Sequence, residues 1–221
     1  MTVGWLPEPR LDLIDLIEGE GKTVLDCGCN TGHTMEELRK RGHTVYGLDI
    51  EDNRQTALDA PFVKMDLSKP RLPFVSDDLM LPDYILFGDV LEHLADPIPA
   101  LKAARSWIGH DGVIIISVPN MGWIGAVLPI ANQHFPREDA GHFDRTHLRF
   151  YTLDVLLDTV REAGFQPEYY MYRQLPDTTP WPEGETGQVM FRWDNVSVLC
   201  GRELYDSLNT YQILLVAKPR S

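Results

Sequence analysis

Two short polar clusters contain the residue types that transfer protons or bind metal ions. The first is the segment Asp89-Val-Leu-Glu92-His93, and the second contains His142 and His147. Imidazole titrates near neutral pH and can therefore accept a proton from a substrate. Carboxylates and imidazoles together also suit Mg²⁺, Mn²⁺ or Zn²⁺. Because Asp89 precedes Glu92 and His93 by three and four residues, one helical turn would bring these side chains together.

A glycine loop precedes both clusters. It reads Asp-Cys-Gly-Cys-Asn-Thr-Gly over residues 26–32, between an apolar run and a helical pattern. Gly28 and Gly32 permit a tight turn and a close approach of a ligand to the backbone, and the following helix presents free N–H groups. Asp49 ends the next apolar run, where a carboxylate can accept hydrogen bonds from two ribose hydroxyls. The pattern predicts a ligand that contains a nucleoside.

These motifs resemble the cofactor site of class I S-adenosylmethionine (SAM) dependent methyltransferases. The loop is Asp-x-Gly-x-x-x-Gly rather than the Gly-x-Gly-x-x-Gly of dinucleotide sites, and SAM carries an ammonium group but no pyrophosphate. The resemblance extends over residues 10–172 and the last apolar run, and it includes Phe-Gly-Asp-Val-Leu-Glu-His at 87–93. It implies that Asp26 helps to hold the methionine end of SAM and that Asp66 contacts the adenine amino group.

The resemblance implies SAM as the cofactor, with S-adenosylhomocysteine as its product. The implied cofactor-binding residues are Asp26, Gly28, Cys29, Asn30, Gly32, Asp49, Ile50, Asp66, Leu67, Gly88 and Asp89. A metal site at Cys27 and Cys29 is not favoured, because no second cysteine pair completes the usual four ligands.

Three interpretations of the polar clusters remain open. In the first, which we favour, His93, His142 or His147 is a general base and no metal is involved. In the second, Asp89, Glu92, His93 and His142 or His147 bind a divalent metal, as in similar ubiquinone-pathway O-methyltransferases and small-RNA 2′-O-methyltransferases. Those relatives carry a glutamate at the Asp89 position, which is one methylene longer. In the third, the residues only shape the pocket.

The elements that must position these residues alternate between apolar runs and helical patterns, which predicts an α/β fold. Following the resemblance, we expect one domain over residues 1–221, with a seven-stranded, mostly parallel sheet, helices on both faces and an antiparallel last strand. The expected strands are 23–27, 44–48, 61–65, 83–87, 112–118, 166–172 and 212–217. Residues 121–150 are expected to form a cap over the acceptor, and residues 174–187 a lid-like excursion.

Composition limits the class of substrate. The 221 residues carry a net charge of −13, which argues against nucleic acids as substrates. No apolar run is long enough to span a membrane, and residues 1–10 lack the pattern of a signal peptide, so we expect a cytoplasmic protein. We also expect a monomer or a homodimer. The expected function is transfer of a methyl group to a small molecule, with oxygen as the favoured acceptor atom. The alternatives are the metal-dependent O-methyltransferase and a catalytically silent SAM-binding protein.

Overall fold

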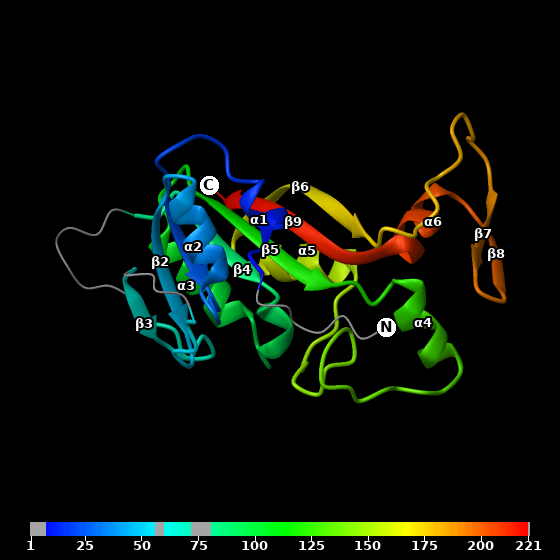
Figure 1. Ribbon diagram of the computed structural model, residues 1–221. Helices are drawn as coiled ribbons and strands as arrows, with labels where there is room; N and C mark the ends of the chain where they lie inside the picture. The colour runs from blue at the N-terminus through cyan, green and yellow to red at the C-terminus, as the bar shows by residue number, and fades with distance from the viewer. Residues whose placement is uncertain (1–7, 56–59, 72–80, 221) are drawn as a thin grey trace.

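A seven-stranded sheet in the order β3-β2-β1-β4-β5-β9-β6 forms the centre of the computed structural model, which describes residues 8–55, 60–71 and 81–220 (Figure 1). The strand β9 is antiparallel to both of its neighbours, and the other pairs are parallel. The predicted fold class is therefore confirmed. The strands of this sheet are β1 (Thr23–Cys27), β2 (Thr44–Asp49), β3 (Phe62–Lys64), β4 (Tyr84–Gly88), β5 (Val113–Pro119), β6 (Phe165–Gln174) and β9 (Thr210–Pro219).

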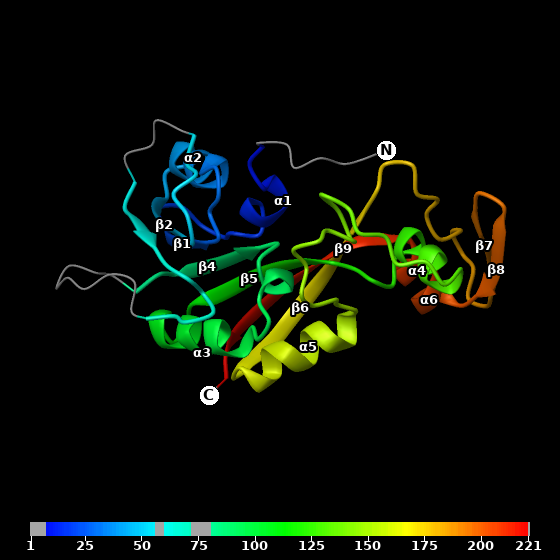
Figure 2. The same ribbon diagram turned by 90° about the horizontal axis from the view of Figure 1, so that it is seen from below.

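Helices cover both faces of the sheet, with α1 and α2 on one face and α3 and α5 on the other (Figure 2). Their apolar residues recur every three or four positions, which places them on one side of each helix. Met35 and Leu38 of α2 are fully buried, as are Leu156 and Val160 of α5. These helices are α1 (Leu11–Ile14), α2 (His33–Lys40), α3 (Ile98–Trp107) and α5 (Leu153–Glu162).

The central strands determine where a ligand can bind. Strand β1 is buried along its whole length, and β5 is buried over its middle five residues, as expected for strands covered on both faces. Because β1, β2 and β4 are parallel, their carboxyl ends meet at one edge of the sheet. The glycine loop follows β1, Asp49 ends β2, and Asp89 follows β4, so the fold gathers these motifs at that edge.

A small second core lies beyond the carboxyl end of β5, at one end of the sheet (Figure 1). It is built from the helix α4 (Ile124–Ala131), the hairpin of β7 (Val189–Trp193) and β8 (Val196–Cys200), and the helix α6 (Arg202–Asn209). The sequence patterns did not predict the hairpin or α6. The buried residues of this core are Ile124, Phe191, Cys200, Tyr205 and Leu208.

Among the described residues, no helix is both long enough and apolar enough to cross a membrane. The expectation of no signal peptide rests largely on residues 1–7, which lie outside the described residues.

Candidate active site

The glycine loop makes a tight turn against the end of β2. Gly28, Asn30 and Gly32 all have positive φ, at 79°, 42° and 80°. The Gly28 amide donates to the Leu48 carbonyl at 2.7 Å. A Cβ atom on Gly28 would lie 2.4 Å from Val90 Cγ2. Only glycine therefore fits this turn, both for its backbone conformation and for its space.

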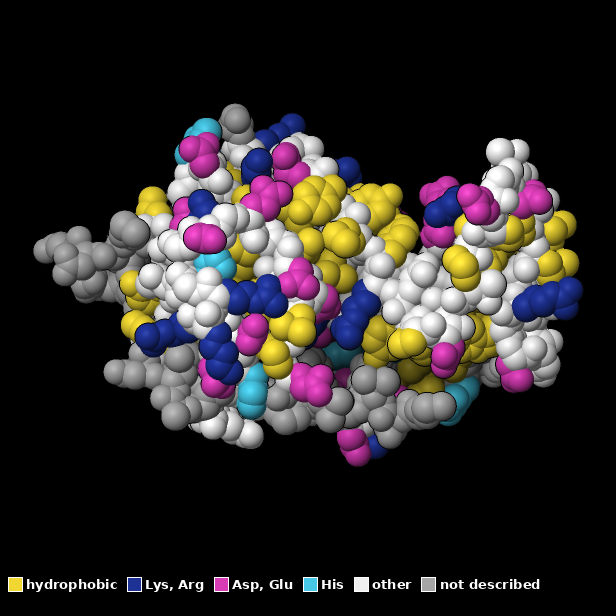
Figure 3. Space-filling view, turned by 45° about the horizontal axis from the view of Figure 1, so that its top comes forward, with side chains coloured by type: hydrophobic (Ala, Val, Ile, Leu, Met, Phe, Trp, Pro, Cys, Tyr) yellow, Lys and Arg dark blue, Asp and Glu magenta, His cyan; other side chains and the backbone are white. Residues whose placement is uncertain are grey.

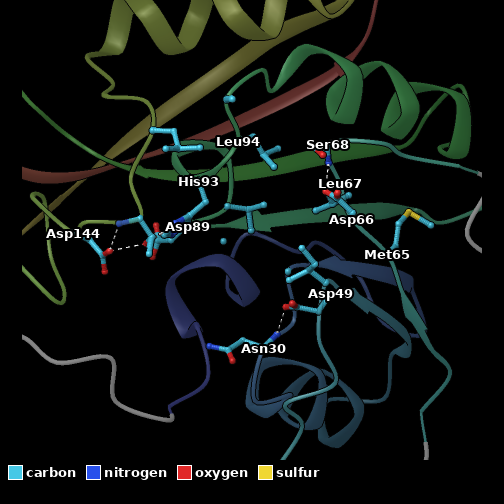
Figure 4. A pocket seen from close by; sticks show the side chains of 17 residues that line it. Asn30, Asp49, Met65, Asp66, Leu67, Ser68, Asp89, His93, Leu94 and Asp144 are labelled. Carbon is cyan, nitrogen blue, oxygen red and sulfur yellow. Dashed lines mark hydrogen bonds between the residues drawn. The ribbon is translucent and has the colours of Figure 1, made fainter.

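A cavity of about 630 Å³ opens at the carboxyl edge of the sheet, within the usual size range of small-molecule sites. In Figure 4, Asp49 and Asp66 lie on the side formed by the loops after β2 and β3, and His93 and Asp144 lie across the cavity from them. The carboxylate of Asp49 accepts a hydrogen bond from the backbone N–H of Asn30 at 2.9 Å, which connects the glycine loop to β2. The predicted residues that line this cavity are Gly28, Asn30, Asp49, Ile50, Asp66, Leu67, Gly88, Asp89 and His93.

Asp26 and Cys29 line a smaller adjoining cavity, which shares Gly28, Asn30 and Gly88 with the first. Asp26 is only 5% exposed. Burial raises the pKa of its carboxyl to about 7, and the nearby charge of Asp49 adds to the increase. Gly32 lines neither of these two cavities and instead occupies the N-cap of α2.

Among the described residues, acidic side chains outnumber Lys and Arg in the lining of the two cavities, where Arg10 is the basic residue of the smaller one. Asp49 and Asp66 line the larger one, Asp26 the smaller one, and Asp89 the larger one beside β4. SAM carries two positive groups, a sulfonium and an ammonium, and one negative carboxylate, so its net charge is positive. Carboxylates spaced along the cavity therefore complement the charges of this cofactor.

Asp89 is held by ionic and hydrogen-bonding partners from three other segments of the chain. Its φ is 56°, and its carboxylate contacts Arg10 Nη1 at 2.5 Å and accepts a hydrogen bond from Ser117 Oγ at 2.9 Å. The amide of Gln212 donates to the same carboxylate. Burial by itself lowers the pKa of Arg10, but the carboxylates of Asp89 and Asp12 outweigh burial and raise it. With these partners, Asp89 is occupied as an anchor for the N-terminal segment.

Glu92, His93 and His147 form a compact cluster beside the larger cavity. One possible ligand atom from each residue lies within 4.8 Å of the other two. Glu92 is 1% exposed, and burial, followed by the charge of Asp89, raises the pKa of its carboxyl. Within the described part of the chain, neither carboxylate oxygen of Glu92 nor Nε2 of His147 has a hydrogen-bond partner. Such unsatisfied buried groups are rare and require an explanation.

The predicted catalytic residue His142 lies apart from this cluster. Its ring packs against Trp123 and Tyr211, with ring centroids 4.9 and 4.6 Å away. Its Nε2–H donates to the Tyr211 carbonyl at 2.9 Å. Burial lowers its pKa to about 4, so the ring is neutral at physiological pH. His142 lines neither of the two cavities described above, and its backbone carbonyl accepts a hydrogen bond from His147 Nδ1 at 3.2 Å.

The sequence patterns missed three polar residues of the site. Arg10 was not predicted, because 79 residues separate it from Asp89 and no local motif surrounds it. Asp144 and Thr146 both line the larger cavity. Their position close to His142 and His147 in the sequence was the only available signal.

Comparison with known proteins finds a matching family and several similar proteins. The family described as "Methyltransferase domain" matches residues 6–170. A ubiquinone biosynthesis O-methyltransferase from Cereibacter sphaeroides is 25% identical over 160 residues, which are 71% of this chain and 65% of that protein. A similar enzyme from Ruegeria pomeroyi is 28% identical over 158 residues, or 66% and 61% of the two chains. The chain thus spans less than two thirds of the length of these relatives.

Solved structures share the fold at low sequence identity. A TehB-like SAM-dependent methyltransferase from Corynebacterium glutamicum has a TM-score of 0.58 and 20% identity, over 98% of this chain and 90% of that one. A 1,6-didemethyltoxoflavin-N1-methyltransferase from Burkholderia thailandensis, solved with S-adenosylhomocysteine bound, has a TM-score of 0.55 and 16% identity, over 92% and 73% of the two chains.

Proposed function

This chain belongs to the methyltransferase domain family, with SAM as its methyl donor, and on that premise we propose that it methylates an oxygen atom of a small molecule. One observation carries the proposal. The Glu92, His93 and His147 cluster lies beside the cavity whose opposite side carries two of the predicted SAM-binding carboxylates, Asp49 and Asp66 (Figure 4). The ubiquinone biosynthesis relatives are O-methyltransferases by name, which supports oxygen as the acceptor atom.

Methyl transfer from a sulfonium is an in-line displacement, so the acceptor must be a good nucleophile. A phenol or alcohol becomes one when its proton is removed, whereas an amine that is already neutral has a free lone pair and needs no base before the transfer. A neutral imidazole at the cavity wall is the group that meets this need. His93 lines the cavity together with Gly88 and Asp89, which follow β4 directly. We therefore assign to His93 the role of receiving the acceptor proton.

A metal-assisted form of the same reaction is the second candidate. It is favoured by the buried oxygens of Glu92 and by His147 Nε2, which lack partners among the described residues. Two imidazoles and one carboxylate are a ligand set of catalytic zinc and of other open divalent sites. Glu92, His93 and His147 together could hold a metal ion. Asp89 and His142, which the sequence patterns indicated as possible ligands, bind other partners instead. A cation bound there would lower the pKa of an acceptor hydroxyl by acting as a Lewis acid.

A small acceptor agrees with the electrostatics better than a nucleic acid does. The chain has a net charge of −13. On the face drawn in Figure 3, the visible Lys and Arg side chains are scattered among acidic ones and form no continuous basic surface. Binding to a phosphate backbone needs such a surface.

The proposal is tested by turnover with SAM and a panel of phenols, catechols, alcohols, amines and carboxylic acids. The expected result is S-adenosylhomocysteine together with a methyl ether, identified by mass spectrometry. His93→Ala should lower kcat by about 10²- to 10⁴-fold without changing SAM affinity. The control His110→Ala, at a histidine whose side chain is 87% exposed, should have no effect. Tight SAM binding without turnover of any hydroxylated acceptor, or methylation of amines alone, would contradict the proposal.

Chelation separates the two candidates. If His93 acts without a metal, EDTA leaves the rate unchanged and Glu92→Gln lowers the rate only slightly. If a metal is bound, EDTA abolishes turnover, Mg²⁺, Mn²⁺ or Zn²⁺ restores it, and Glu92→Gln is as damaging as His93→Ala. Elemental analysis of the purified protein provides a readout that does not depend on the acceptor.

A further inference from the structure

A chain of three side chains leads from the cavity wall into the loop after α4. The hydroxyl Oγ1 of Thr146 lies 3.0 Å from His93 Nδ1 and 2.6 Å from the carboxylate Oδ1 of Asp144. The Asp144 oxygen also accepts the Thr146 amide hydrogen at 2.7 Å. All three residues line the larger cavity, and Figure 4 shows His93 and Asp144 on the same side of it.

The protons in this chain have only one consistent arrangement. Burial raises the pKa of Asp144, but the hydrogen bonds from the Thr146 hydroxyl and amide outweigh burial and lower it. An ionised carboxylate can only accept hydrogen bonds, so the Thr146 hydroxyl donates its single hydrogen to Asp144. The Thr146 oxygen must then accept from His93, which requires a hydrogen on His93 Nδ1. In the neutral ring, Nε2 is left unprotonated.

We propose that Asp144 and Thr146 are positioning residues that hold His93 in the tautomer protonated at Nδ1, so that Nε2 keeps its lone pair for the reaction. The functional part of this inference rests on the proposed role of His93 at the acceptor. A base, or a metal ligand, acts through an unprotonated nitrogen, and a partner on the other nitrogen selects the tautomer. The arrangement therefore serves either form of the reaction.

A purely local role of Asp144 does not account for the contact with His93. An aspartate that accepts the amide two residues ahead forms an Asx turn, which shapes the loop by itself. The Thr146 hydroxyl is not needed for that turn. Its second contact reaches a residue 53 positions away in the sequence. His147 shows the same principle. Its Nδ1 donates to the His142 carbonyl, and burial lowers the pKa of its ring, so in the neutral ring Nε2 keeps its lone pair.

The test uses the whole 221-residue chain with ¹⁵N-labelled histidine. Nuclear magnetic resonance then distinguishes a protonated from an unprotonated ring nitrogen. The His93 signals are assigned from their loss in His93→Gln. Wild type and Thr146→Ser, which keeps the hydroxyl, should show the Nδ1–H tautomer. Thr146→Val, which has a similar size but no hydroxyl, should show both tautomers in exchange. Asp144→Ala, which frees the hydroxyl to donate to Nδ1, should shift His93 towards Nε2–H.

Turnover is measured on the same variants. Thr146→Val should lose about 10- to 100-fold in kcat, the usual scale for a residue that orients a functional histidine, with SAM affinity unchanged. Thr146→Ser should keep most of the wild-type rate, because it keeps the hydroxyl. If Thr146 only filled space, Thr146→Val would keep the rate as well. A wild-type His93 protonated at Nε2, or a Thr146→Val spectrum identical to wild type, would overturn the proposal.

The spectra and the rates separate this inference from the proposed function. If the tautomer responds as expected but kcat does not, the tautomer is controlled as inferred and the positioning role is refuted. If the tautomer responds as expected and no hydroxylated acceptor is methylated, the proton arrangement is supported and the proposed function fails by itself.

Discussion

Asp26 should make the ligand-free protein less stable as the pH rises. Its pKa in the folded state is about 7, compared with an ordinary value of 3.8. Between these values the folded protein keeps a proton that the unfolded chain has lost, so the free energy of unfolding falls as pH increases. At about 1.4 kcal/mol for each tenfold change in proton affinity, the full cost above pH 7 is about 4 kcal/mol.

Asp26→Asn removes this cost, because the amide does not ionise. The variant should gain stability relative to wild type as pH rises, by about 2 to 3 kcal/mol between pH 5 and pH 8. The affinity of the variant for SAM should fall. If Asp26 binds the methionine ammonium as predicted, the variant loses a charge-assisted hydrogen bond worth about 1.5 to 3 kcal/mol, or at least about tenfold in affinity.

The measurements are urea unfolding of the ligand-free protein at both pH values and calorimetric titration with SAM. Asp111→Asn is the control, because the side chain of Asp111 is fully exposed, and it should change neither quantity. A stability difference between Asp26→Asn and wild type that is independent of pH would show that the buried charge has no such cost. Unchanged SAM affinity would remove Asp26 from the cofactor site.

Three other results are expected. Asp49→Ala should lower SAM affinity about tenfold or more by calorimetry and leave the ligand-free melting temperature near that of wild type, whereas NADH should not bind to either protein. Gly28→Ala should cost about 1 to 3 kcal/mol in urea unfolding and abolish SAM binding, because its Cβ meets a valine side chain 2.4 Å away. The control Gly184→Ala has a similar φ of 81° with no atom within 4 Å of the new Cβ, and it should show the smaller cost of backbone strain alone. Amide hydrogen exchange in residues 121–150 and 174–187 should slow when SAM and acceptor bind, and equal exchange would contradict their predicted roles as cap and lid.

The fold was predictable because its signals are local. A parallel strand buried on both faces needs an unbroken apolar run, and Val-Ile-Ile-Ile at the start of β5 supplies one. The hairpin of β7 and β8 has no such signal. Its residues alternate between exposed positions and positions that are half-buried or buried, and its core depends on α4 and α6. Its burial is therefore decided by partners distant in the sequence.

For the predicted cofactor site, residue spacing was sufficient to expect its motifs at one edge of the sheet. A strand, a glycine turn and an acidic residue at the end of the next strand are joined by short segments, and parallel pairing of β1 with β2 brings them together. The positions of Gly28 and Asp49 at the larger cavity follow from that geometry. The amino-acid sequence by itself thus determined the fold class, the edge of the sheet where the two cavities open and four of the carboxylates that line them, Asp26, Asp49, Asp66 and Asp89.

Only the tertiary structure decided which polar side chains act together after β4. In sequence, Asp89 and Glu92 look like neighbours in one cluster. In the structure, Arg10 and Gln212 hold Asp89, and Glu92 is left near His147. Contacts between such distant segments depend on how loops from different strands pack, and residue spacing carries no record of that packing. The same holds for the proton on His93, since only the fold places Thr146 beside it.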